Sequence, residues 1–268
     1  MLNDKPNIPI EVHILRELIV SHPEIILTLA ALVSETGLWL LDSTRELISE
    51  FAKKSSIRKF YKDRQLWPYL KRLLKAPTPS LGLELLRSTG VLKIFLPELN
   101  NCYKVSQNKK YHKYDVFEHL LLACDRCITN DVRLKLATLL HDIGKPATRK
   151  ETEIGITFHK HEVLGKKLAR RVVTRLGMEI QDANFVVELV GNHMYQYDRA
   201  WKDSTVRRFI RKTGLSEDTA GKIHDFPLFQ LRDADRMGRD LAPITQKQKD
   251  FEERLTQTLF KDKPSTCG

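Results

Sequence analysis

The stretch LKLATLLHDIGK, residues 134–145, decides how the rest of the chain is interpreted. Its apolar residues recur at helical spacing, and the run ends at an adjacent His141 and Asp142. A neutral imidazole is a good ligand for first-row transition metals, and the carboxylate beside it has two oxygens that can bridge two ions. Gly144 follows as a helix stop, and Lys145 adds a cation. The stretch therefore predicts a helix that carries a metal-binding pair at its end.

Helical periodicity extends outward from this stretch over most of the chain. Apolar residues recur at three- and four-residue spacing in segments 11–20, 24–34, 38–52, 66–74, 116–127, 132–141, 162–176, 182–194 and 245–260. Residues 149–157, RKETEIGIT, are polar and β-branched and predict a loop or a short hairpin at most. The sequence predicts an all-α protein with an N-terminal helical section, 1–105, followed by a larger helical body, 106–268.

Local signals mark where these helices begin and end. Helix stops are expected at three further glycines, and N-caps at two polar pairs. The signals are Gly90, Gly177 and Gly214 for the stops, Asn130-Asp131 and Asp203-Ser204 for the caps, and Pro77 and Pro79 for a break.

Composition excludes several classes of protein. The longest apolar stretch, 25–41, is interrupted by Ser34, Glu35 and Gly37, so it predicts a buried helix and not a membrane span. The first residues show no basic start leading into an apolar run, so no signal peptide is expected and the protein is interpreted as cytoplasmic. The 4 cysteines are too sparse for a disulfide framework, and Cys124 and Cys127 are expected to be packing residues within a helix.

The formal net charge of +11 is unevenly distributed over the 268 residues. Residues 1–50 hold 3 basic and 8 acidic side chains, whereas residues 51–75 hold 9 basic and 1 acidic. A cluster of this kind favours a polyanionic partner, because each Lys or Arg near a phosphate releases a condensed counterion. A solvated helix face is the alternative explanation for the same charges.

Four histidines and two aspartates form a candidate ligand set on, or at the edge of, predicted helices: His119, His141, Asp142, His161, His193 and Asp235. Nitrogen and oxygen ligands without thiolates suit Mn, Fe, Co, Ni or Zn, as one ion or as two. Two such ions can generate hydroxide near neutral pH and hold a phosphoryl group. His112 and His159 are not expected to be ligands, and His13, His22 and His224 are interpreted as ordinary helix or loop residues.

Six strings around these residues resemble the HD superfamily of metal-dependent phosphohydrolases. They are YHKYDVFEH, HDIGKPATR, TFHKHEVLGKKLARR, VGNHM, VRRFIRKTG and LRDADRMG. They are closer still to the body of the bacterial CCA-adding tRNA nucleotidyltransferase and poly(A) polymerase family, and residues 70–99 resemble the neck that precedes the HD domain there. The resemblance covers residues 64–240 and implies a helical HD-domain bundle behind a neck.

The resemblance also implies roles for individual residues. His119, His141, Asp142 and Asp235 would form the core metal site, and Asp142 would bridge to a second ion held by His161 and His193. Lys145 would hold substrate phosphate, so Asp142 and Lys145 are the expected catalytic residues. Arg236 is a second candidate for holding phosphate.

Two functions follow as hypotheses. In the first, metal-bound hydroxide hydrolyses a nucleotide or an RNA end, tRNA included, as a 2′,3′-cyclic phosphodiesterase, 2′-nucleotidase or phosphatase. Nucleotide addition is not expected, because the first hundred residues lack the adjacent glycines and the D-x-D that the family's nucleotidyltransferase head requires. In the second, the chain is an RNA-binding body that works with a separate nucleotidyltransferase and hydrolyses little or nothing.

The basic segment, residues 53–75, carries the second hypothesis. It interleaves aromatic side chains with nine basic ones, a mixture that can stack bases and hold phosphates. We expect Lys53, Lys54, Arg58 and Lys59 to bind RNA. The alternative is that the aromatic residues Phe60, Tyr61, Trp67 and Tyr69 face the core while the cations face water.

Overall fold

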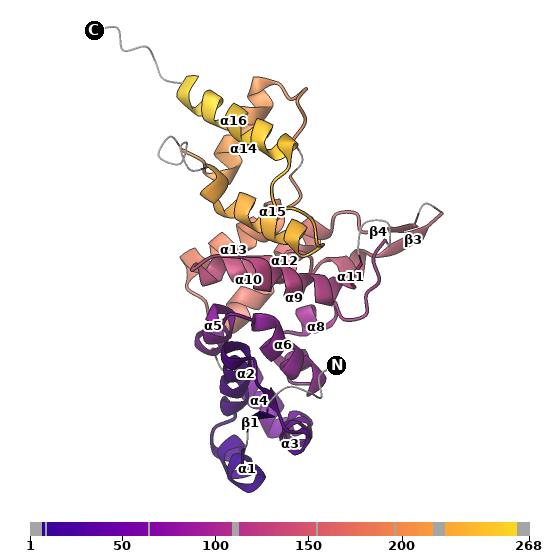
Figure 1. The fold of residues 1–268 in the computed structure, drawn as a ribbon, viewed down its shortest axis with the longest axis vertical. Coiled ribbons are helices and arrows are strands. Elements are labelled where there is room, and N and C mark those ends of the chain that lie inside the picture. Colours follow the sequence, from indigo (N-terminus) through magenta and orange to yellow (C-terminus); the bar gives the residue numbers. More distant parts are fainter. Residues whose placement is uncertain are drawn as a thin grey trace, which may run out of the picture.

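The computed structural model describes residues 7–8, 10–63, 65–108, 113–153, 155–195, 197–216 and 223–261. His112 and Cys267 therefore lie outside the described residues. The molecule is elongated, with the N-terminal helices at one end and the C-terminal helices at the other (Figure 1). The predicted ligands fall in the region between these two ends. The all-α prediction is confirmed.

The N-terminal section packs around α2, which is apolar on most of its faces. Its helices are α1 (Val12–Ser21), α2 (Ile25–Thr36), α3 (Asp42–Ala52), α4 (Ser55–Asp63), α5 (Trp67–Lys75), α6 (Pro79–Ser88), α7 (Leu92–Phe95) and α8 (Pro97–Asn100). Helix α6 approaches α2 so closely that a Cβ on Gly82 would lie 2.3 Å from the carbonyl oxygen of Ala30. The strands β1 (Asn7–Ile8) and β2 (Trp39–Leu40) form a short parallel pair.

The body that follows is built around α10, which is buried along nearly its whole length. Its helices are α9 (Val116–Arg126), α10 (Val132–Leu140), α11 (Lys145–Thr148), α12 (His161–Leu176), α13 (Ile180–Asn192), α14 (Asp203–Thr213), α15 (Pro227–Met237) and α16 (Gln246–Lys261). Helices α9, α13 and α15 surround α10. A helix enclosed in this way fixes the position of whatever follows its last turn.

The stretch 149–157 forms an antiparallel hairpin of β3 (Lys150–Thr152) and β4 (Gly155–Thr157), as the sequence allowed. The hairpin projects from the side of the body (Figure 1). Asp131 caps α10 by accepting a hydrogen bond from the amide of Arg133, as predicted. The predicted cap at Asp203-Ser204 is wrong, because Lys202 is the N-cap of α14 and Asp203 is its first residue.

The cysteines behave as packing residues. Cys102, Cys124 and Cys127 are buried and free, and burial raises the pKa of the Cys124 thiol well above its usual range. The Cys127 sulfur accepts a hydrogen bond from Thr138 at 3.6 Å. The sequence interpretation of Cys124 and Cys127 therefore agrees with the structure.

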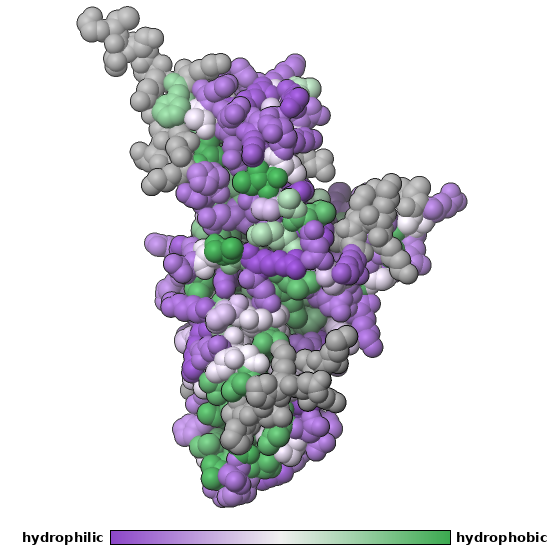
Figure 2. All heavy atoms as spheres, viewed as in Figure 1, coloured by the Kyte–Doolittle hydropathy of each residue, from purple (hydrophilic) through white to green (hydrophobic). Residues whose placement is uncertain are grey.

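The surface differs between the two ends of the molecule. Figure 2 shows apolar residues reaching the surface at the N-terminal end, where Ile14, Leu18 and Val20 of α1 are exposed. Hydrophilic residues predominate at the opposite end, over α14 and α16 (Figure 2). Among the described residues, no helix combines the length and the apolar character needed to cross a membrane.

Candidate metal centre and its pocket

The fold brings all six sequence-predicted ligands together, from five separate places in the chain. His119 comes from α9, the pair His141-Asp142 from the turn after α10, His161 from the start of α12, His193 from the residue after α13 and Asp235 from α15. Each residue is at most 7% exposed. Burying so many polar groups is costly unless they are paired or bind a metal.

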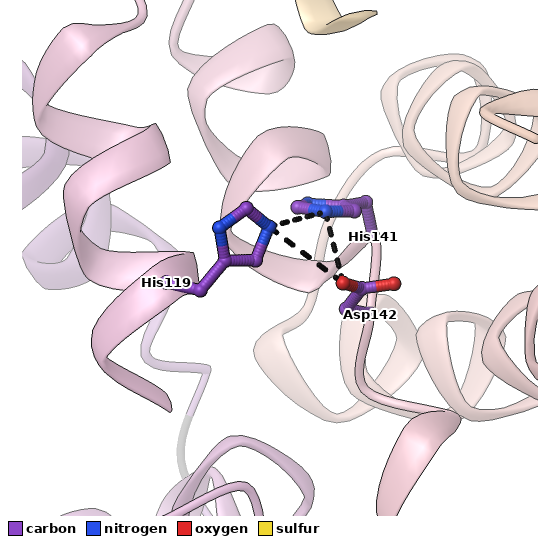
Figure 3. Close-up of side chains that lie close together, drawn as sticks. All are labelled: His119, His141 and Asp142. Carbon is purple, nitrogen blue, oxygen red and sulfur yellow. Dashed lines mark hydrogen bonds and ion pairs between the residues drawn. The ribbon is translucent and has the colours of Figure 1, made fainter. Parts of the chain in front are cut away.

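The first group of donors is His119, His141 and Asp142 (Figure 3). The Nε2 atoms of His119 and His141 lie 3.3 Å apart, and Oδ2 of Asp142 lies 3.3 Å from the His141 Nε2. Asp235 joins this group, because its Oδ1 lies 3.2 Å from the Nε2 of His119. These four donors can converge on one ion.

The second group of donors is Asp142, His161 and His193. The Nε2 atoms of the two histidines lie 3.3 Å apart. Oδ1 of Asp142 lies 3.2 Å from the His161 Nε2 and 3.6 Å from the His193 Nε2. Asp142 thus directs one carboxylate oxygen at each group, which is the arrangement a bridging ligand requires.

Backbone carbonyls fix the tautomers of three of the histidines. Nδ1 of His141 donates to the carbonyl of Thr138 at 2.7 Å, and Nδ1 of His193 donates to that of Val190 at 2.7 Å. Nδ1 of His161 donates to the carbonyl of Phe158 at 2.8 Å. Since a carbonyl only accepts, each ring presents its Nε2 to the centre, as metal-binding histidines do.

The electrostatics of the protein alone favour a cation at this centre. Burial by itself lowers the pKa of His141, but Asp142 and Asp235 outweigh it and raise that pKa to about 10. Burial opposes ionisation of Asp142, yet Lys145 and His141 hold its pKa well below the usual range. The carboxylates therefore stay ionised, and a bound metal would take the place of the proton on His141.

The spacing of the donors fits a divalent ion. Donors about 2.0–2.2 Å from one ion lie roughly 3–3.5 Å from each other in tetrahedral or octahedral coordination. The closest donor pairs in both groups lie 3.2–3.3 Å apart. The residues present thus fit a metal in distance, tautomer and charge.

The centre opens into a cavity of about 650 Å³, which we call the metal pocket. Lys145, the predicted phosphate-binding residue, lines it. Its Nζ lies 2.6 Å from Oδ2 of Asp142 and donates to Oε1 of Gln107 at 2.7 Å. His159 also lines the pocket without belonging to either donor group, as expected.

Two arginines in this pocket were not singled out by the sequence. Arg232 and Arg239 line it, and both face the carboxylate of Asp235, at 3.6 and 3.0 Å. Helical spacing could have found them, because residues three before and four after Asp235 share its face. Arg236 was expected to hold phosphate here, but its Nε donates to the carbonyls of Ala242 and Pro243 and it does not line the metal pocket.

Gly144 was expected to stop a helix, but α10 already ends at Leu140. The structure gives Gly144 another role. Its φ of −79° suits any residue, yet a Cβ there would lie 2.1 Å from the carbonyl oxygen of His161 and 2.8 Å from the amide of Gly165. The absent side chain lets α12 approach the His141-Asp142 turn, which brings the two donor groups together.

We expect Gly144→Ala to lower the free energy of unfolding by about 3 kcal/mol or more, since overpacking typically costs about 1–3 kcal/mol and the clash here is with backbone. Chemical denaturation measures the loss. Gly214→Ala is the matched control, because its Cβ would meet nothing within 4 Å and only the positive φ of 75° is strained. A Gly144→Ala variant as stable as Gly214→Ala would contradict the close approach.

The remaining histidines and the basic segment lie elsewhere. His13, His22 and His224 have exposed side chains. Lys53, Lys54, Arg58 and Lys59 are exposed around the junction of α3 and α4. Lys54 pairs with Glu50 at 3.2 Å.

The aromatic residues of the basic segment face inward. Tyr61 is fully buried and donates to the carbonyl of Pro23 at 2.8 Å. Phe60, Trp67 and Tyr69 are partly buried and pack against the core. The described cations of the segment are therefore exposed to solvent, and base stacking on Tyr61 is excluded.

Comparison with known families gives two matches. The HD domain model matches residues 111–242. The model described as "Probable RNA and SrmB- binding site of polymerase A" matches residues 40–103, which include the whole basic segment.

Individual relatives match the same region. An A-adding tRNA nucleotidyltransferase of Deinococcus radiodurans is 35% identical over 53% of this chain and 34% of its own length. A CC-adding tRNA nucleotidyltransferase of Thermus thermophilus is 32% identical over 56% of this chain and 35% of its own. A multifunctional CCA protein of Teredinibacter turnerae is 27% identical over 78% of this chain and 51% of its own. The chain thus spans about a third to a half of these curated relatives.

Proposed function

We propose that this chain is a metal-dependent phosphohydrolase. The match to the HD domain, preceded by the match to an RNA-binding segment of polymerase A, supports this proposal. The substrate would be a phosphate ester on a nucleotide or an RNA end, cleaved as by a 2′,3′-cyclic phosphodiesterase, 2′-nucleotidase or phosphatase. One observation carries the proposal. Asp142 directs its two carboxylate oxygens at two buried groups of imidazoles, at the wall of a pocket that Lys145 also lines.

The residues of the centre divide between two ions in this proposal. His119, His141 and Asp235 would hold one ion, His161 and His193 the other, and Asp142 would bridge them. When bound, such ions supply Lewis acidity and an activated water for attack on phosphorus. The donor set suits Mn, Fe, Co, Ni and Zn alike.

The rest of the pocket supplies charge to the substrate phosphate. Lys145 is held by Asp142 and Gln107, so its ammonium is already in place before a substrate binds. The guanidinium groups of Arg232 and Arg239 are held by Asp235. Cations fixed in a buried site stabilise the charge that develops on phosphoryl oxygens without having to reorganise.

Metal content and phosphate release test the proposal together. Protein purified without added metal is assayed for bound transition metals, then for hydrolysis of bis-p-nitrophenyl phosphate and 2′,3′-cyclic AMP with Mn²⁺, Ni²⁺ or Co²⁺, with and without chelator. We expect chelator-sensitive hydrolysis. A protein that retains no metal and hydrolyses neither compound under any of these conditions would sink the proposal.

RNA binding is a second candidate function, compatible with the first. The observation that favours it is the match over residues 40–103 together with the four exposed cations at the junction of α3 and α4. In this case the chain would present tRNA or another RNA to a separate nucleotidyltransferase. It could do so with little or no hydrolysis.

Neutralising Lys53, Lys54, Arg58 and Lys59 together is expected to weaken RNA binding and to flatten its salt dependence. Each lost phosphate contact lowers the slope of log K against log salt by about 0.7–0.9. Fluorescence anisotropy with a tRNA over a salt series measures the slope. The control neutralises Lys166, Lys167, Arg170 and Arg171 of α12, which removes the same charge elsewhere. Equal slopes for the two variants would assign the basic segment to a solvated face.

A further inference from the structure

A second cavity, of about 310 Å³, lies beside the metal pocket and shares one wall with it. We call it the second pocket. Residues of α15, of the first two turns of α16 and of the segment after His193 line it. Its lining combines three aromatic rings with three cations: Tyr195, Tyr197, Phe251, Arg232, Arg236 and Lys247.

Two elements run from the metal pocket into the second pocket. His193 and Met194 line the first cavity, and Tyr195 and Tyr197 line the second. Along α15, Asp235 lines the first cavity, Arg236 the second and Arg232 both. A ligand that begins at the metal centre can therefore continue along the same two elements.

Arg232 joins the two cavities physically. Its guanidinium lies 3.6 Å from Oδ2 of Asp235, which belongs to the metal centre, and 5.8 Å from the ring centroid of Tyr195. The guanidinium of Arg232 thus lies near Asp235 in the metal pocket and near Tyr195 in the second pocket.

The second pocket is prepared for negative charge. Arg236 is anchored by the carbonyls of Ala242 and Pro243, which accept its Nε hydrogen bond but bring no negative charge. Lys247 is exposed at the start of α16. An anion in this cavity would meet three cations that line it.

We propose that the second pocket binds the nucleotide next to the scissile phosphate, so that the substrate is an oligonucleotide end and not a mononucleotide. Cations held in place pair with phosphates. Tyr197 and Phe251 are buried and stacked on each other, so we expect the pocket to bind the nucleotide through its phosphate and not by base stacking. A small phosphate ester would fill the metal pocket alone and would leave the cations of the second pocket unused. The proposal rests on the proposed function, in which the metal pocket receives the terminal phosphate.

Binding of product-type ligands tests the second pocket without any turnover. The affinity of adenylyl-(3′→5′)-adenosine 2′-phosphate is compared with that of 2′-AMP by calorimetry on the metal-loaded protein. The dinucleotide adds one phosphate that the cations of the second pocket can bind, so we expect it to bind about tenfold more tightly, a difference of about 1.4 kcal/mol. Equal affinities would overturn the proposal.

Replacing a lysine of the second pocket by glutamate tests whether this pocket causes the tighter binding of the dinucleotide. Lys247→Glu is expected to remove most of the dinucleotide's advantage and to leave the affinity for 2′-AMP unchanged. Lys249→Glu is the matched control, because Lys249 is also exposed on α16 but lines a different cavity. Arg236→Gln, which keeps a donor and removes the charge, should act like Lys247→Glu. Equal losses in Lys247→Glu and Lys249→Glu would reduce the effect to net charge and contradict the proposal.

Hydrolysis separates this inference from the proposed function. If the protein prefers the dinucleotide but hydrolyses no ester, the result supports nucleotide binding in the second pocket and contradicts the proposed hydrolase activity. If mononucleotide and dinucleotide cyclic phosphates are hydrolysed with equal kcat/KM and their products bind equally, the result supports the hydrolase activity and contradicts nucleotide binding in the second pocket.

Discussion

Replacing Asp142 by alanine is expected to abolish hydrolysis and to strip the protein of metal at the same time. Asp142 is the one residue shared by both donor groups, and each of its oxygens serves one of them. Its removal also leaves Lys145 buried beside Gln107 without a carboxylate partner. Metal ions contribute several kcal/mol of transition-state stabilisation, so the rate should fall by roughly three orders of magnitude or more.

The measurements are metal content by mass spectrometry and the hydrolysis rate at saturating Mn²⁺, Ni²⁺ or Co²⁺. Breaking a buried ion pair costs about 3–5 kcal/mol, so Asp142→Ala could fail to fold. Asp142→Asn keeps the volume and removes the charge, and circular dichroism shows whether each variant is helical. His224→Ala is the control, because His224 is exposed and belongs to neither donor group. Equal losses in Asp142→Ala and His224→Ala would overturn the ligand assignment.

Helical periodicity located the longer helices of the body to within about two residues. Segment 162–176 became α12, His161–Leu176, and segment 182–194 became α13, Ile180–Asn192. Both helices bury one face against neighbours, and that burial is what the spacing of apolar residues encodes. The parallel pair of β1 and β2 was not predicted, because it joins residues about thirty positions apart through backbone bonds.

The six candidate ligands were accessible from sequence because each lies on, or at the edge of, a helix within a recognisable string. The position of Asp142 between the two donor groups was not, since it depends on how closely α12 approaches the turn after α10. Gly144 permits that approach, and in the sequence it looked like an ordinary helix stop. Gln107 gave no signal at all, because it is a buried loop residue that contacts Lys145 across 38 positions.

Arg236 illustrates how neighbours in sequence can line different cavities. It is adjacent to Asp235 in sequence, but successive residues of a helix point about 100° apart. Arg232 and Arg239 share the face of Asp235, whereas Arg236 turns toward the second pocket. In the oligonucleotide substrate proposed above, Arg236 would meet a different phosphate from the one at the metal centre.

Lys145→Met is expected to remove activity while leaving metal bound, whereas Asp142→Ala is expected to lose both activity and metal. The ammonium of Lys145 competes with an ion for Oδ2 of Asp142, from which it lies 2.6 Å. Metal affinity should therefore stay the same or increase when the charge is removed. Losing one fixed charge donor at a transition state typically costs about 10²–10³ in rate, or about 2.7–4 kcal/mol.

The decisive readout is the pair of measurements, metal content and kcat, taken on the same sample. Lys150→Met on β3 is the matched control, since Lys150 is an exposed lysine of the neighbouring hairpin. A parallel loss of metal and rate in Lys145→Met would show that Lys145 only positions Asp142. An unchanged rate would show that it does not hold phosphate. A loss of rate with metal retained assigns Lys145 to the substrate, because its charge then contributes to the rate without being needed to hold the metal.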